Sequence, residues 1–362
     1  MLGRTAEALA TWRALAAEPA ISAEALAGAA ILAPEAITDD ELALLRSAAA
    51  AETGSARIAL PFALGSVLEA RGEDEAAFET FAEGNARKRA SLTGRFAPAA
   101  VAAENARSAR LVTDTFNADF IARRAGRGAR SSAPIFIVGF PRSGSTLIER
   151  ILAAHPEVQA LGETGVVGAV LDPAWRAGLA GADFVALAAT CLEAERGAGW
   201  SRAPRFNDKT LENYLHVGAI ALMFPSAVII ESRRDPVEAC LSCWRELFAA
   251  DAETLYDFAD IGAEYRRYAA VMAHWRAALP GRVVAVDHEA LVAEPKAQTR
   301  RLVTEVCGLS WDPACLRFFE AGGPVRTASA AQVRRPLFRR EPRRRRWAAR
   351  IGTLLEALGE LA

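Results

Sequence analysis

The chain has 362 residues and a mass of 38.6 kDa, of which 52% are hydrophobic and 24% are charged. These proportions exclude a disordered chain and a small disulfide-stapled protein, because enough apolar side chains are present to form a full core. The 43 Lys and Arg residues nearly balance the 44 Asp and Glu residues, so the chain lacks the basic excess of a typical nucleic-acid-binding protein. We expect two domains and no nucleic-acid partner.

The cysteines and the apolar runs indicate where in the cell the protein is located and whether it binds a metal. An odd, scattered set of five cysteines favours reduced thiols in a cytosol. The chain begins with an early acidic residue and no apolar core, unlike a secretory signal, and no run reaches the ~18–20 apolar residues that span a bilayer. Cys240 and Cys243 lie in a predicted helix without a second cysteine pair or a nearby His. We therefore expect a cytoplasmic protein with no membrane span and no metal.

Residues 1–108 have the pattern of an all-helical region with a net negative charge. Between 58 and 91, small residues such as Gly65 and Ala77 alternate with apolar residues and with Phe81 at helical spacings. This resembles the 34-residue tetratricopeptide pattern, in which small residues let two antiparallel helices approach closely. Trp12 stands 69 residues before Phe81, about two repeat lengths. The alternative is an ordinary pair of amphipathic helices.

Residues 109–362 carry a net positive charge and show a different pattern. A loop rich in Gly, Arg and Ser, residues 125–134, precedes the first short apolar run. Three such runs read as buried strands, at 134–140, 227–230 and 282–286, and helical stretches follow at 146–154, 237–249 and 294–307. Alternation of strands and helices predicts an α/β fold with a parallel, P-loop-type sheet and flanking helices. We place the domain boundary between 108 and 109.

The first predicted strand leads directly into the sequence GFPRSGSTL, residues 139–147. Gly139 and Gly144 are separated by four residues, and one residue separates Gly144 from Thr146, as in a phosphate-binding loop. Backbone N–H groups of such a loop and the following helix N-terminus bind phosphate. Ser145 stands where a Walker A motif has Lys, which disfavours triphosphate hydrolysis but leaves a 5′-phosphate site. Arg142 lies inside the loop and can reach the group beyond that phosphate.

The segment PRSGSTL after a buried strand resembles the 5′-phosphosulfate loop of sulfotransferases that use 3′-phosphoadenosine 5′-phosphosulfate (PAPS). A second segment, with Arg234 in RDP and Ser242 eight residues later, resembles the 3′-phosphate segment of that family. Glu163 in LGE is placed as in tyrosylprotein sulfotransferases, and residues 207–210 resemble the lysine segment of the family. The order of a helical repeat region and then this domain is similar to that of bacterial tetratricopeptide-containing sulfotransferases.

The resemblance implies a role for each matching residue. Glu163 would be the general base, and its basicity would need raising by partial burial. Lys209 and Arg142 would stabilise the sulfonate and the bridging oxygen, and Ser329 would hydrogen-bond near the leaving group. No metal is implied. The residues implied in nucleotide binding are Arg142, Ser143, Gly144, Ser145, Thr146, Arg234, Ser242 and Arg346.

Two departures and two alternative functions stand beside this hypothesis. The histidine base of the small-molecule branch would fall near Leu211, so that base is absent, and a run of arginines, 343–346, replaces the usual Gly-containing turn before Trp347. A P-loop nucleotide kinase or other phosphotransferase is one alternative, and a non-catalytic repeat scaffold is the other. The acceptor hydroxyl stays open between a peptide tyrosine, a glycan and a small molecule, and a protein or a glycan is one candidate partner besides the PAPS nucleotide.

Overall fold

The computed structural model describes residues 5–18, 22–50, 55–176, 178–179, 181–201, 203–249, 252–320 and 341–362. The chain divides into two compact units. Unit 1 comprises Met1–Glu104, Pro236–Tyr265 and Arg340–Ala362, and unit 2 comprises Asn105–Asp235 and Arg266–Arg339. Each unit is therefore built from segments that are far apart in the sequence. The domain boundary at 108 stays a prediction.

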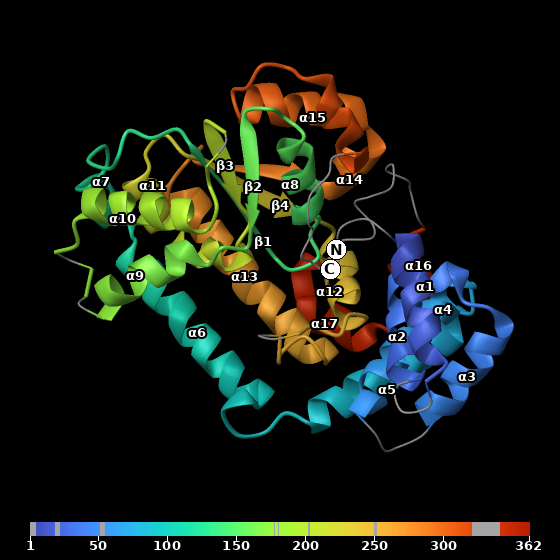
Figure 1. Ribbon diagram of the computed structural model, residues 1–362. Helices are drawn as coiled ribbons and strands as arrows, with labels where there is room; N and C mark the ends of the chain where they lie inside the picture. The colour runs from blue at the N-terminus through green and yellow to red at the C-terminus, as the bar shows by residue number, and fades with distance from the viewer. Residues whose placement is uncertain are drawn as a thin grey trace. The chain divides into compact units, whose positions relative to one another are not determined.

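Unit 1 is helical throughout its described residues (Figure 1). Its main helices are α1 (Thr5–Ala16), α2 (Ser22–Leu32), α3 (Asp39–Ala50), α4 (Ala59–Ala70), α5 (Asp74–Ala90), α12 (Pro236–Trp244), α16 (Arg343–Arg346) and α17 (Gly352–Leu358). Short turns of helix are η1 (Pro34–Ala36), η2 (Ser55–Arg57), η3 (Gly94–Phe96) and η8 (Gly359–Leu361). Two long helices, α6 (Pro98–Thr115) and α13 (Phe258–Ala278), contribute residues to both units.

The helices of unit 1 pack closely where the sequence has small residues. A Cβ on Gly65 of α4 would lie 2.9 Å from the ring of Phe81 on α5, and a Cβ on Gly28 would lie 2.7 Å from the ring of Trp12. These contacts agree with the predicted close approach of paired helices, whereas a tetratricopeptide array stays a prediction. The helix predicted at 237–249 corresponds to α12, which ends five residues earlier, at Trp244.

An aromatic cluster joins the three segments of unit 1. Phe78 of α5 lies with its ring centroid 4.8 Å from that of Trp244 on α12 and 5.5 Å from that of Trp347. Trp244 also lies 4.7 Å from Phe258 of α13. Because aromatic side chains bury large apolar areas, this cluster is a main source of cohesion between segments distant in sequence.

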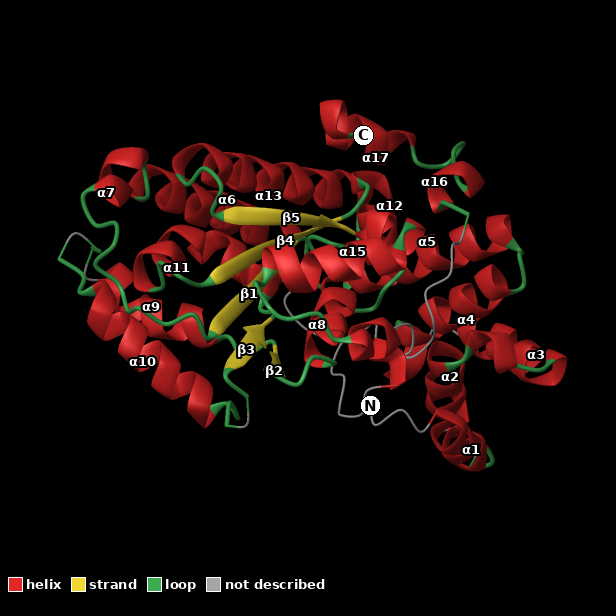
Figure 2. Ribbon diagram, turned by 90° about the horizontal axis from the view of Figure 1, so that it is seen from above, coloured by secondary structure: helices red, strands yellow, loops and turns green. Residues whose placement is uncertain are grey.

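Unit 2 contains the predicted parallel α/β sheet. Five strands, all paired in parallel, have the order β2-β3-β1-β4-β5 (Figures 1 and 2). They are β1 (Pro134–Gly139), β2 (Val158–Gly162), β3 (Arg205–Asp208), β4 (Val228–Arg233) and β5 (Val283–Asp287). The helices are α7 (Ala118–Ala122), α8 (Ser145–Ala153), α9 (Val166–Arg176), α10 (Phe184–Gly197), α11 (Val217–Met223), α14 (His288–Ala293) and α15 (Pro295–Arg301), with turns η4 (Leu211–His216), η5 (Leu302–Val306) and η6 (Pro313–Glu320). The three predicted strands correspond to β1, β4 and β5.

Side chains alternate between the two faces of the central strand β1. Ile135 and Ile137 join a buried cluster with α8, α14, η5 and η6 on one face. Phe136 points to the other face, where its ring centroid lies 6.0 Å from that of Phe224 beyond α11. The predicted helix at 294–307 changes pitch along its length, because α15 ends at Arg301 and continues as the π-helical segment η5.

Candidate functional site

The carboxyl ends of parallel strands meet at one edge of the sheet, and each strand of unit 2 delivers a polar residue or loop there. Along the order β2-β3-β1-β4-β5, these are Glu163, Lys209, the loop 140–144, Arg234 and His288. Ligands of open α/β sheets bind at this edge. Residues separated by as many as 148 positions in the sequence are thus gathered by strand order alone.

The loop between β1 and α8 has the backbone of an anion cradle. Arg142 has a φ of +65° and Gly144 a φ of +100°, both in the left-handed region. A Cβ on Gly139 would lie 2.8 Å from the carbonyl oxygen of Ser232, so the loop passes close to β4. Ser143 is buried, and its Oγ donates to Ser232 Oγ at 3.1 Å. Such alternation of backbone conformation before a helix N-terminus turns successive N–H groups toward one anion.

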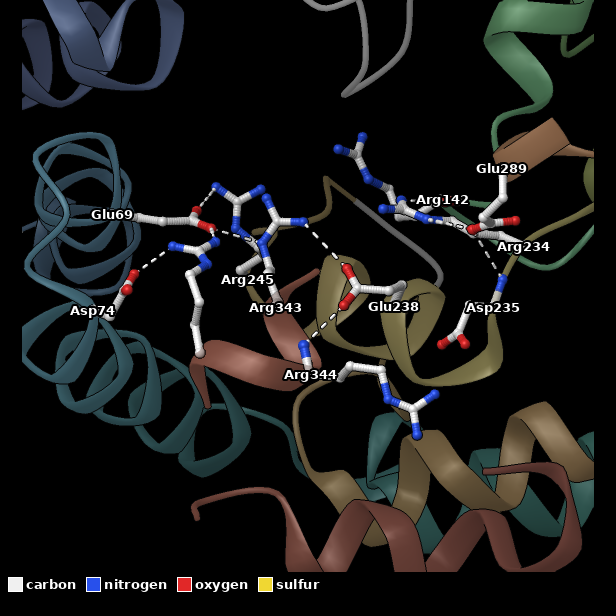
Figure 3. Close-up of polar contacts among 11 residues, drawn as sticks. Glu69, Asp74, Arg142, Arg234, Asp235, Glu238, Arg245, Glu289, Arg343 and Arg344 are labelled. Atoms are coloured by element: carbon white, nitrogen blue, oxygen red, sulfur yellow. Dashed lines mark hydrogen bonds and ion pairs between the residues drawn. The ribbon is translucent and has the colours of Figure 1, made fainter. Parts of the chain in front are cut away.

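Arg234, one residue after β4, is held against this loop (Figure 3). Its Nη1 donates to the backbone carbonyl of Arg142 at 3.1 Å, and its Nε lies 4.0 Å from Oε1 of Glu289. The same Glu289 oxygen accepts from the backbone N–H of Asp235 at 3.2 Å. The Arg234 guanidinium therefore fixes the phosphate loop and brings positive charge beside it.

Glu163 and Lys209 form an ion pair at the ends of the neighbouring strands β2 and β3. The Lys209 side chain is only 1% exposed, whereas that of Glu163 is 51% exposed. The Lys209 backbone N–H donates to the carbonyl of Gly162 at 2.8 Å, which sets the two residues side by side. The carboxylate of Glu163 is therefore accessible from solvent, whereas its partner Lys209 is buried beneath it.

A residue without a role in the sequence analysis, Glu149 on α8, interacts electrostatically with this pair. Its side chain is buried, and its Oε1 has no hydrogen-bond partner among the described residues. Burial raises the pKa of the Glu149 carboxyl, while the charge of Lys209 opposes that shift and the charge of Glu163 adds to it. The sequence signal was weak, because a Glu inside an amphipathic helix is usually a surface residue.

The loop after β2 that carries Glu163 is tied to β3 by a buried carboxylate. Asp208 accepts hydrogen bonds from the backbone N–H and the Oγ1 of Thr210, at 2.8 and 2.6 Å, and from Asn213 Nδ2 at 2.9 Å. The backbone N–H of Thr164 also donates to Asp208. Thr210 Oγ1 accepts in turn from the N–H of Gly165 at 3.0 Å. Burial raises the pKa of Asp208, and these hydrogen bonds counteract it.

Comparison with known proteins identifies the domain that carries this geometry. Residues 134–313 match the model of the sulfotransferase family. Residues 134–313 therefore form a sulfotransferase-family domain, which covers just under half of the chain. Among the described residues, no helix has the length and apolar character needed to cross a membrane, and no group of His, Cys, Asp and Glu side chains is arranged to hold a metal ion.

The individual relatives of this chain match at low identity. An uncharacterised protein of Aquifex aeolicus is 29% identical over 344 residues, covering 89% of this chain and 44% of that protein. Protein-tyrosine sulfotransferase A of Caenorhabditis elegans is 29% identical over 202 residues, covering 52% of this chain and 53% of that protein. The chain thus spans about half the length of these relatives. The sulfotransferase domain of the Synechococcus PCC 7002 olefin synthase is 20% identical, with a TM-score of 0.40, and covers 59% of this chain and 92% of that one.

Most of the predicted site residues lie in unit 2. Ser145 and Thr146 are buried in the first turn of α8, after Arg142, Ser143 and Gly144 of the loop. Ser242 lies in unit 1, buried on α12, and Ser329 lies outside the described residues. The roles of these residues stay predictions.

Arg346 also belongs to unit 1, where it pairs with the carboxylate of Glu69. Arg245 and Arg343 lie around the same carboxylate (Figure 3). Glu69 of α4 lies 2.5 Å from Nη2 of Arg245, 2.7 Å from Nε of Arg343 and 2.7 Å from Nη2 of Arg346. Arg346 pairs with Asp74 as well. Burial would raise the pKa of Glu69, but the charges of Arg245 and Arg343 outweigh it and lower that pKa to about 2.

His288, the first residue of α14, is a second member of the site that sequence reasoning missed. A Cβ on Gly144 would lie 2.7 Å from its Nδ1, so the imidazole packs directly against the phosphate loop. Burial and the charge of Arg234 lower the pKa of His288 to about 4, so the ring is neutral at pH 7. Its position, two residues after the third predicted strand, was the available signal.

Proposed function

We propose that this protein transfers a sulfuryl group from PAPS to an acceptor hydroxyl, with Glu163 as general base. One observation carries the proposal. Glu163, Lys209, the phosphate loop and Arg234 follow four adjacent strands, and so form a continuous row along one edge of the sheet. A base, a buried cation, an anion cradle and a second cation are the groups that in-line sulfuryl transfer requires.

The loop supports binding of a 5′-phosphosulfate rather than a triphosphate. Its positive-φ residues and the start of α8 provide N–H donors for one phosphate, and Ser145 occupies the position of the Walker lysine. Arg234 supplies charge for the 3′-phosphate, together with Ser242 by resemblance to the family. Arg346 would have to leave Glu69 and Asp74 to reach a nucleotide, so the 3′-phosphate proposal rests mainly on Arg234.

The chemistry follows from the Glu163–Lys209 pair. The acceptor oxygen attacks sulfur and its proton passes to the Glu163 carboxylate, while the bond from sulfur to the bridging phosphate oxygen breaks and the electron pair stays on that oxygen. Protonation of Glu163 removes the negative partner of Lys209, whose ammonium then stabilises the charge that develops on the sulfonate and the leaving oxygen. Arg142 and Ser329 are assigned to the same sulfonate and leaving oxygen by resemblance.

The acceptor that best fits is a tyrosine hydroxyl of a peptide. The proposal draws on the similarity to protein-tyrosine sulfotransferase A, which extends over 202 residues. It is consistent with the half-exposed carboxylate of Glu163, which a large acceptor can reach from solvent. A glycan hydroxyl is the second acceptor class to be assayed.

Calorimetric titration tests the donor site. We expect adenosine 3′,5′-bisphosphate to bind at least tenfold more tightly than adenosine 5′-phosphate, and ATP with Mg²⁺ to bind more weakly than the bisphosphate. Preference for ATP with Mg²⁺ would contradict the proposal and place the chain among phosphotransferases. Absence of binding for all three nucleotides would favour a non-catalytic scaffold.

A further inference from the structure

The loop that carries Glu163 is attached to helix α10 through Thr164, its immediate neighbour. Thr164 Oγ1 donates to Oε1 of Glu195 at 3.1 Å, and the same hydroxyl accepts from the backbone N–H of Val166 at 3.3 Å. Together with the N–H of Thr164 on Asp208, these bonds fix the backbone on the carboxyl side of Glu163. Glu195 is the contact that reaches this loop from outside the sheet.

Glu195 occupies a site that does not suit a charged carboxylate. Its side chain is fully buried, and its Oε2 has no hydrogen-bond partner among the described residues. Burial, followed by the nearby charge of Asp208 on β3, raises the pKa of Glu195 to about 8. Cys191, one turn earlier on α10, is its other titratable neighbour, and its thiol has a raised pKa through burial and through Glu195 itself.

Two buried carboxyls that interact cannot both ionise easily, and their hydrogen bonds decide which one holds the proton. Asp208 accepts from two backbone N–H groups, one hydroxyl and one amide, all of which favour its charged form. Glu195 accepts from the hydroxyl of Thr164 alone. The hydrogen bonds therefore favour the charged form more strongly at Asp208 than at Glu195, and Glu195, with a pKa raised to about 8, is the better holder of a proton.

We propose that Glu195 is a positioning residue for catalysis, which as a neutral carboxylic acid holds Thr164 and thereby fixes Glu163 beside Lys209. The inference rests on the proposed function, since it assumes that Glu163 is the base. The hydrogen bond from Thr164 by itself favours ionised Glu195, but ionisation leaves a charged carboxylate in a buried site beside Asp208. The burial and repulsion outweigh that one bond, drive the carboxyl toward water and release Thr164. Glu163 then loses its fixed orientation toward the acceptor, and turnover falls.

The decisive experiment compares the pH dependence of kcat between pH 6.5 and 9.5 in four proteins. We expect the wild type to lose activity as pH rises through about 8, the pKa of Glu195. Glu195→Gln keeps a neutral hydrogen-bond acceptor, so its kcat at pH 7 should stay within about threefold of wild type and the alkaline loss should disappear. Glu195→Ala should lower kcat roughly tenfold to a hundredfold, with bisphosphate affinity unchanged. Glu193→Gln, at an exposed position on the same helix, is the matched control.

A second pair of variants tests the contact itself. Thr164→Ser keeps the hydroxyl and should retain activity, whereas Thr164→Val removes it and should reproduce Glu195→Ala. An alkaline loss that persists unchanged in Glu195→Gln, or wild-type turnover in Glu195→Ala, would overturn the proposal.

Hydrogen exchange separates this inference from the proposed function, because it needs no substrate. Amide protection of residues 164–166 should be lower in Glu195→Ala than in Glu195→Gln at the same pH. Should no acceptor be sulfated while this protection pattern is present, the role of Glu163 would be rejected and the tether by Glu195 retained. Equal protection in both variants would reject the tether.

Discussion

Two glutamates of this protein have buried side chains, but their pKa values are shifted in opposite directions. Glu69 in unit 1 is surrounded by three arginines, and their charges lower its pKa to about 2. Glu195 in unit 2 has a carboxylate and a thiol as titratable neighbours, and burial raises its pKa to about 8. Burial alone therefore does not set the charge of a carboxyl; the partners that the fold brings to it do.

The difference separates an ion cluster that joins chain segments from a polar network that supports chemistry. The Glu69 cluster unites α4 with α16 and with Arg245, the residue after α12, which are far apart in the sequence, and Glu69 is paired with all three arginines. The network around Asp208 and Glu195 instead holds Thr164, the residue that follows the half-exposed Glu163. Substitutions in the two regions are therefore expected to affect turnover and stability differently.

The largest effect is expected at Glu163, the proposed base. Glu163→Gln should lower kcat by about 10²- to 10⁴-fold, the usual contribution of general base catalysis, while bisphosphate affinity stays within about threefold. Steady-state kinetics with a tyrosine peptide and calorimetry measure the two quantities. Glu157→Gln, an exposed residue before β2, is the control. Near wild-type turnover of Glu163→Gln would refute the assignment.

Removal of Glu69 should have the largest effect on stability. Glu69→Ala leaves three guanidinium groups around an empty position and should lower the free energy of unfolding by about 3–5 kcal/mol. Chemical denaturation measures this loss. Glu73→Ala, which breaks the exposed pair with Arg46, should change stability by less than about 1 kcal/mol. A loss at Glu69 no larger than at Glu73 would show that the cluster is energetically neutral.

Lys209→Ala removes the buried cation of the proposed active site. We expect kcat to fall about 10²- to 10³-fold, because a preorganised charge at the developing anion is lost. The control is Lys296→Ala, at an exposed position on α15, which should behave as wild type. Sulfuryl transfer measured under donor saturation distinguishes this from weaker PAPS binding. A change confined to KM would mean that Lys209 binds substrate without stabilising the transition state.

Arg234→Ala tests the 3′-phosphate assignment and should have an intermediate effect. Loss of a charged hydrogen bond, worth about 1.5–3 kcal/mol, should weaken the bisphosphate about tenfold or more and spare adenosine 5′-phosphate. The neighbouring exposed residue provides the control, Arg233→Ala. Equal weakening of both nucleotides would indicate instead that Arg234 acts through the Arg142 carbonyl and the loop.

The pH dependence of stability at Glu195 tests the same comparison without any substrate. Between its ordinary value of 4.5 and about 8, the folded protein keeps a proton that the unfolded chain has released. The free energy of unfolding should therefore fall with rising pH by up to about 1.4 kcal/mol per pH unit, relative to Glu195→Gln. Chemical denaturation at pH 5, 6, 7 and 8 checks this. Glu69 should act in the opposite sense: its contribution is present above pH 4.5 and is lost as pH falls toward 2. If the free energy of unfolding of the wild type, relative to Glu195→Gln, rises or stays constant with pH, Glu195 does not hold a proton in the folded protein.

Prediction from sequence succeeded where local pattern and burial agree. The short runs that became β1, β4 and β5 begin with consecutive apolar residues, although most of β5 is only half-buried, and the loop after β1 has the spacing of a phosphate-binding loop. It failed for β3, whose four residues Arg205–Asp208 are mostly polar. This strand forms because pairing with β1 on one side and β2 on the other satisfies its backbone hydrogen bonds. The local sequence does not predict such pairing.

The sequence alone predicted the loop at 139–147 from its spacing and the parallel α/β class from its alternating apolar and helical segments. It offered Arg142, Glu163, Lys209 and Arg234 as site residues through the resemblance to sulfotransferases, and their roles stay predictions. Only the tertiary structure decided that Glu149, Glu195 and His288 belong around these residues, and that Arg346 pairs with Glu69 and Asp74. The physical reason is that charge state and hydrogen bonding depend on neighbours in space. Strand order and burial bring those neighbours together across more than a hundred residues of chain.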